Sequence, residues 1–110
     1  MEFEKSTVFT LAESVDYSEN ATVSKMVIKK QTGNITLFAF DKGQSLSEHS
    51  APFDAYVQVT EGKGRIIINK KEYDLTAGQF IVMPANIPHA VQALEKFKMM
   101  LVMIKGLSNP

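Results

Sequence analysis

The chain has two histidines, His49 and His89, and no cysteine, so these imidazoles are its best candidates for chemistry near neutral pH. Neutral imidazole binds transition metals, and its ordinary pKa also suits general acid or base catalysis. The absence of cysteine excludes disulfides, thiol nucleophiles and thiolate metal sites. Whether the two histidines form a site depends on whether the fold brings them together.

The side chains of a β-strand point alternately to its two faces, which predicts what surrounds each histidine. If His49 faces the interior of a β-structure and His89 does the same, two imidazoles meet in an apolar interior. The neighbours expected on those inner faces are small or apolar: Ala51, Ala55, Val57, Val91 and Ala93.

A structural role is the alternative for this pair. Buried histidines are often bonded to backbone, to water or to each other without binding any ligand. Two histidines and no others in the chain favour a shared site, which could bind a small anion or an enolizable carbonyl even without metal.

The composition favours one globular domain without a nucleic-acid or membrane partner. The 110 residues are 45% apolar, and 12 basic residues balance 12 acidic ones. Nucleic acid and anionic membranes require a positive field that this balance does not supply. No signal peptide and no apolar run of membrane-spanning length is visible, so we expect a cytoplasmic protein.

Short strands separated by turn residues dominate the chain from Val23 onward. Residues 1–22 are expected to form an N-terminal arm, with one helical turn at residues 10–13, and residues 23–110 a β-barrel domain. Gly62 and Gly64 are expected to form a tight hairpin between two strands. The expected strands cover residues 23–30, 35–40, 55–60, 65–68, 73–75, 80–83, 88–94 and 97–104.

Two of these segments, residues 66–68 and 99–104, are apolar on both faces. Such strands are covered on both sides, by the barrel interior and by another layer or subunit. Because an exposed apolar face would promote association, we expect a homodimer.

The spacing of several of these residues resembles the two conserved motifs of the cupin family. Gly43 precedes His49 by six positions, and Gly62 falls where the first motif ends. In the second motif, Gly78 precedes Pro84 by six positions and His89 follows. The resemblance covers roughly residues 35–104 and implies an all-β, double-stranded β-helix or jelly-roll barrel.

The resemblance also implies a metal site, with departures. Metal-binding cupins use three histidines and one glutamate, but Ala51 and Ala55 occupy the second histidine and the glutamate positions here. Ala93 replaces the asparagine that ends the second motif. Only His49 and His89 carry over, which implies weak binding of one divalent ion of iron, nickel, manganese, copper or zinc, completed by water or substrate.

The three alanines leave volume that something must fill, since empty core space is destabilising. Phe53, a methionine, water or a small ligand could fill it. We therefore expect an enlarged, mostly apolar pocket with the two histidines as its polar floor. Its expected lining is Ala51, Phe53, Ala55, Val57, Val91 and Ala93.

Three functions remain open from the sequence. One is a module that binds a small molecule in the barrel, with weak binding of a divalent metal by the two histidines. Another is a metal-dependent cupin enzyme, an oxygenase or isomerase of a small metabolite. The third is a storage or structural role with a vestigial pocket. Whether the protein is an enzyme is undecided, because such barrels support many activities.

Overall fold

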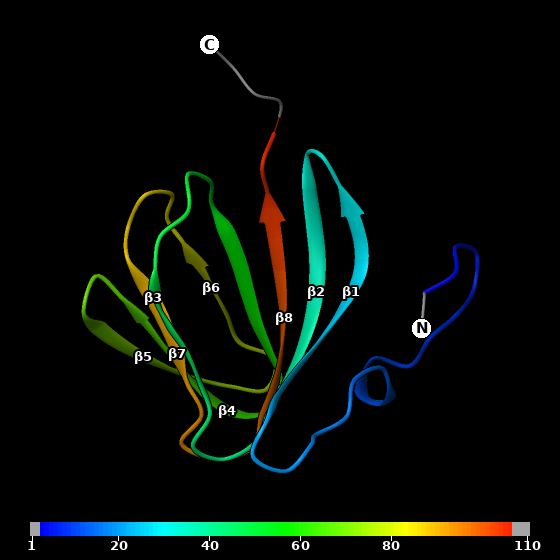
Figure 1. Ribbon diagram of the computed structural model, residues 1–110, viewed down its shortest axis with the longest axis horizontal. Helices are drawn as coiled ribbons and strands as arrows, with labels where there is room; N and C mark the ends of the chain where they lie inside the picture. Colours follow the sequence, from blue (N-terminus) through cyan, green and yellow to red (C-terminus); the bar gives the residue numbers. More distant parts are fainter. Residues whose placement is uncertain (1–2, 107–110) are drawn as a thin grey trace.

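The structure, a computed structural model, describes residues 3–106 and is built almost entirely of β-strands (Figure 1). The sequence expectation of an all-β fold is therefore confirmed. One 3₁₀ turn, η1 (Leu11–Glu13), precedes the strands. The strands are β1 (Thr22–Lys30), β2 (Gly33–Phe40), β3 (Ser45–His49), β4 (Ala55–Ile68), β5 (Lys71–Thr76), β6 (Phe80–Met83), β7 (His89–Gln92) and β8 (Phe97–Ile104).

All strand pairs are antiparallel, and the long strand β4 joins two layers. The first part of β4 pairs with β8 and β6, and β8 continues to β2 and β1. The second part pairs with β5 and β7, and β7 continues to β3. The sheet therefore curls, so that the β1–β2–β8 side and the β3–β7 side face each other across the interior (Figure 1).

The expected hairpin at Gly62 and Gly64 is wrong, because β4 runs through both glycines as one strand. Gly62 has a φ of +76°, and the β4–β8 register shifts between Val59 and Glu61. A side chain on Gly64 would overlap the ring of Phe97. The glycines thus allow β4 to bend from one layer to the other against β8, instead of reversing the chain.

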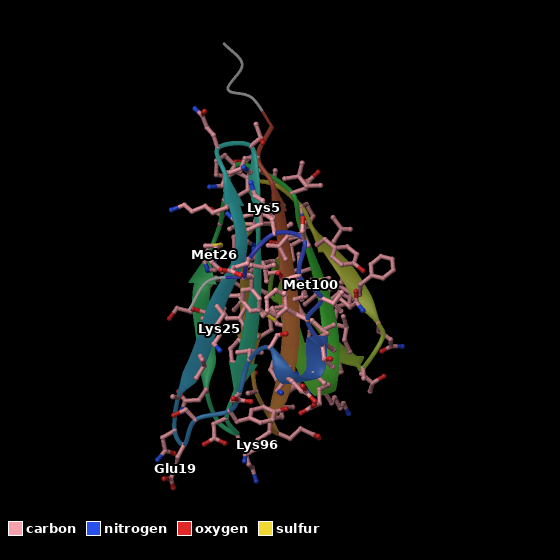
Figure 2. The ribbon with its side chains drawn as sticks, turned by 90° about the vertical axis from the view of Figure 1, so that its right-hand side faces the viewer. Lys5, Glu19, Lys25, Met26, Lys96 and Met100 are labelled. Atoms are coloured by element: carbon pink, nitrogen blue, oxygen red, sulfur yellow. The ribbon has the colours of Figure 1, made fainter. Side chains whose placement is uncertain are left out.

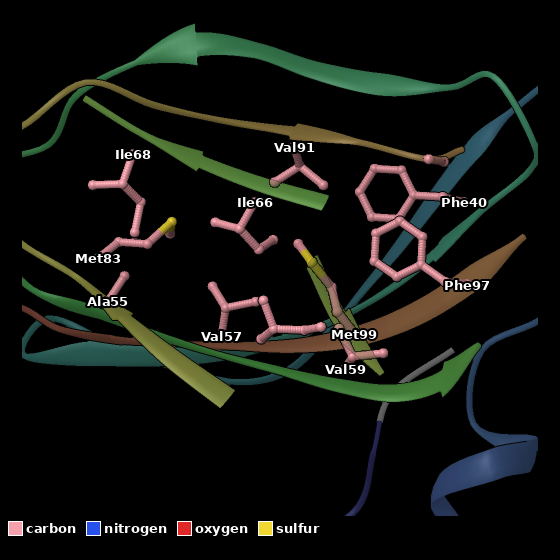
Figure 3. Close-up of a cluster of buried hydrophobic side chains, with 12 residues drawn as sticks. Phe40, Ala55, Val57, Val59, Ile66, Ile68, Met83, Val91, Phe97 and Met99 are labelled. Carbon is pink, nitrogen blue, oxygen red and sulfur yellow. The ribbon is translucent and has the colours of Figure 1, made fainter. Parts of the chain in front are cut away.

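Apolar side chains from both layers fill the interior (Figure 3). Phe40 and Phe97 stack at one end, with ring centroids 4.7 Å apart, and both are fully buried. Ala55 and Met83 lie at the opposite end of the cluster in the figure. The aromatic end is filled by this stack, which leaves the alanine end as the place where open volume remains.

The N-terminal arm packs on the outer face of the β1–β2–β8 layer (Figure 2). Val15 is 2% exposed and packs with Leu37, while Tyr17 donates a hydrogen bond to Glu61. The 3₁₀ turn η1 lies within this arm, and the side chain of Thr10, which precedes it, makes no capping hydrogen bond. Among the described residues, no helix is long and apolar enough to cross a membrane.

Candidate functional site

His49 and His89 face each other across two paired strands. His49 ends β3 and His89 begins β7, and the two are register partners. Their ring centroids are 4.4 Å apart, with the ring planes at 69° in an edge-to-face arrangement. His49 is exposed, whereas His89 is 7% exposed, so the pair runs from the surface into the interior.

Backbone carbonyls determine which nitrogen of each imidazole carries the proton and which one keeps a lone pair. The Nδ1 atom of His49 lies 2.8 Å from the Ser47 carbonyl oxygen, and Nδ1 of His89 lies 3.2 Å from that of Ile87. A carbonyl oxygen only accepts hydrogen bonds, so each Nδ1 carries the proton and donates it. In the neutral rings both Nε2 atoms therefore keep a lone pair.

Burial favours the neutral form of His89. Loss of hydration lowers the pKa of His89 below its ordinary value, and the nearby His49 ring adds a smaller lowering. The hydrogen bond to the Ile87 carbonyl acts in the opposite direction. The neutral ring of His89 therefore has its Nε2 lone pair available to accept a hydrogen bond.

A cavity of about 250 Å³ opens beside this pair between the two layers. Apart from the two imidazoles, its lining is entirely apolar, and no Lys, Arg, Asp or Glu contributes to it. The lining consists of Phe38, Leu46, His49, Ala51, Ala55, Met83, His89, Val91, Met99, Leu101 and Met103.

Some of the residues expected in the pocket line this cavity and others do not. Ala51, Ala55 and Val91 line it together with both histidines. Phe53 does not; its ring lies 5.6 Å from the Lys105 ammonium instead. Val57 and Ala93, 0% and 3% exposed, belong to the packed core beyond the cavity. Whether the lining residues bind a ligand stays a prediction.

The residues of β8 that line the cavity were not among those expected from the sequence. Met99, Leu101 and Met103 alternate along β8 and all face the cavity. The signal was present, because alternation from the buried Phe97 places these residues on one inner face. Both faces of β8 are apolar, however, so the sequence did not show which face was the inner one.

The side chains around the two histidines do not provide the full set of metal ligands found in metal-binding cupins. Among residues 3–106 there is no group of three or more His, Cys, Asp or Glu side chains that could hold a metal ion. Asp54, the nearest acidic residue in sequence to the missing ligands, accepts a hydrogen bond from the Ala85 backbone. Two neutral imidazoles are fewer than the three or four protein ligands usual for zinc, and they offset no charge on a divalent ion.

Comparison with known proteins places the chain in a family. The cupin domain model matches residues 36–105, so the chain belongs to the cupin family. A conserved protein of unknown function from Streptococcus pyogenes is 38% identical, with a TM-score of 0.91 over 98% of this chain and 95% of that one. None of the curated proteins compared matches the chain.

Two further solved structures differ widely in their identity to this chain. A cupin 2 conserved barrel domain protein from Leptotrichia buccalis is 44% identical, with a TM-score of 0.85; the match covers 88% of this chain and 47% of that one. Salicylate 1,2-dioxygenase from Pseudaminobacter salicylatoxidans is 17% identical, with a TM-score of 0.71, covering 77% of this chain and 26% of that one. The latter likeness shows the shared fold alone.

Proposed function

We propose that this protein is a small-molecule-binding cupin, and that the cavity between its two layers is the binding site. The observation that carries the proposal is the pairing of His49 and His89 at one side of an otherwise apolar cavity. Ligand sites in proteins commonly combine apolar walls with a few convergent polar groups, and this cavity has that composition.

The cavity is large enough for a small organic molecule. An apolar cavity of ~150 Å³ is known to bind benzene, so the 250 Å³ here accommodates a substituted ring or a short branched chain. Three of its lining residues are methionines, whose flexible side chains adapt to different shapes. Size and lining together favour a compact and mostly apolar ligand.

A thermal-shift screen of small metabolites tests the proposal. A molecule that binds only the folded state raises its stability by mass action. The expected result is a ligand-dependent shift that is lost in His49→Ala and His89→Ala and kept in Phe53→Leu, which lies outside the cavity. If a ligand raises the unfolding temperature of all three variants as much as that of the wild type, it binds outside the cavity, which would refute the proposal.

Weak binding of a divalent transition metal is the second candidate, as an accessory to the ligand or as the centre of an oxygenase or isomerase. The observation that favours it is the close approach of the two imidazoles, each with its Nδ1 bonded to a backbone carbonyl, which leaves the Nε2 atom of each neutral ring free to bind a metal ion. Metal analysis of the purified protein tests it. Stoichiometric iron, nickel, manganese, copper or zinc that disappears in the two alanine variants would support the metal site. Metal-free protein that also fails to bind added metal would exclude it.

We also expect a cytoplasmic homodimer. Side chains on the outer face of the β4–β6–β8 layer support dimerisation: Phe80, Val82 and Ile104 are 60%, 51% and 67% exposed. The arm already covers part of β8, because Met100 packs against it. Sedimentation equilibrium of the wild type and Val82→Glu tests this expectation: a dimer weakened by the substitution supports it, and a wild-type monomer contradicts it.

A further inference from the structure

The hydrogen-bond pattern of the histidine pair restricts the chemistry of any ligand in the cavity. Both Nδ1 protons are committed to the carbonyls of Ser47 and Ile87. Within the described residues, no hydrogen bond reaches either Nε2 atom. The polar side of the cavity therefore presents acceptors and no donors when both rings are neutral.

The rest of the lining supplies no polar side chain. Every other lining residue is alanine, valine, leucine, methionine or phenylalanine. A carboxylate or phosphate would find no cation in this lining, and an ammonium ion would find no anion. Burying an unpaired charge is costly, so the cavity discriminates against permanently charged ligands.

We infer that the ligand is a small, neutral, largely apolar molecule with a hydroxyl group at one end, such as a phenol or an enol, which donates its proton to the imidazole pair. This inference rests on the proposed binding function and names its ligand class. The two ring centroids lie 4.4 Å apart and both rings line the cavity, so a hydroxyl that reaches one imidazole lies next to the other and donates its single proton to one of the two Nε2 atoms. The apolar body of the molecule then extends along the methionines of β8.

Three matched probes separate a donor from other head groups: 4-methylphenol, 4-methylanisole and 4-methylbenzoate. They share the same methylated ring and differ in the group that would meet His49 and His89. Calorimetric titration at neutral pH gives the three affinities. We expect 4-methylphenol to bind roughly tenfold more tightly than 4-methylanisole, because the ether offers no proton to the Nε2 atom of His89. The benzoate is expected to bind most weakly.

The variant His89→Phe keeps an aromatic ring in place and removes the acceptor. In this variant the preference for 4-methylphenol over 4-methylanisole should fall to about one, while 4-methylanisole still binds. The ratio is measured within one protein, so a change in overall stability does not mimic the effect. Phe53→Leu is the matched control outside the cavity and should keep the wild-type ratio.

The outcomes separate this inference from the proposed function. Equal affinities for 4-methylphenol and 4-methylanisole in the wild type, or tighter binding of the benzoate, would overturn the inference and leave a small-molecule site in place. Failure of all three probes and of the metabolite screen to bind would remove the proposed function itself. A preference for the phenol that survives in His89→Phe would also overturn the assignment of the acceptor.

Discussion

His49 and His89 are register partners on β3 and β7, and their rings meet edge to face at 4.4 Å although they lie forty positions apart in the chain. Each ring is anchored by its Nδ1 atom to a carbonyl two residues earlier on its own strand or the loop before it. The pair is thus oriented by backbone that the strand pairing itself fixes, which makes its response to substitution predictable.

Restoring the missing ligands should create a metal site. Ala51 and Ala55 line the cavity beside both histidines, so the double variant Ala51→His, Ala55→Glu adds a third imidazole and a carboxylate. We expect it to bind one divalent ion, because the carboxylate offsets charge that two neutral rings cannot. Metal analysis and thermal unfolding with and without chelator measure the effect.

Without metal, the restored variant should be less stable than the wild type, because Ala55 is 6% exposed and a buried glutamate would lack a partner. Metal at a hundredfold excess over its Kd should return about 2.7 kcal/mol. Ala77→Glu, in an exposed turn, is the control and should bind no metal. If added metal does not change the stability of the restored variant, the side chains at positions 49, 51, 55 and 89 do not converge on one ion.

Filling the cavity should abolish ligand binding without unfolding the protein. Ala55→Leu places a larger side chain into the open volume, so the free energy of unfolding should stay within about 1.5 kcal/mol of the wild type. Val57→Leu is the matched control on the same strand, where the core is fully packed. There the added volume should cost about 1 to 3 kcal/mol. Urea unfolding and ligand titration measure both variants, and equal losses of stability would argue against an open cavity at Ala55.

Stability should depend on pH through His89. Its folded-state pKa is lowered by burial, so below the ordinary value of 6.5 the unfolded chain binds more protons than the folded one. Stability contributed by neutral His89 is therefore present above pH 6.5 and is lost as the pH falls below it. Urea unfolding between pH 7.5 and 5 should show a steeper loss for the wild type than for His89→Phe. Parallel curves for the two proteins would mean that His89 is not desolvated.

The bend of β4 should be intolerant of a side chain at Gly64. The added methyl group of Gly64→Ala would overlap the Phe97 ring, which is fully buried and stacked on Phe40. We expect a loss of about 1 to 3 kcal/mol in unfolding free energy, typical of overpacking. Combining it with Phe97→Leu should recover part of the loss, because the smaller side chain yields space. If the losses of unfolding free energy in the two single variants simply add in the double variant, the strain does not arise between residues 64 and 97.

Much of the fold followed from the sequence because its signals are local. Frequent turn residues and β-branched runs indicate short strands, and the spacing of Gly43, His49, Pro84 and His89 is typical of the cupin motifs. Strand β3, however, escaped detection. Its five residues include one apolar side chain, Leu46, and most of the strand is exposed, so no hydrophobic pattern identifies it.

The sequence by itself determined an all-β chain with two histidines at family positions and small residues around them. Tertiary structure alone decided that β4 bends instead of turning back, that Phe53 lies outside the cavity and that the methionines of β8 form its wall. These features depend on which strands pair and in which register. Pairing joins segments far apart in the chain, so the local pattern of residues allows more than one arrangement and does not decide between them.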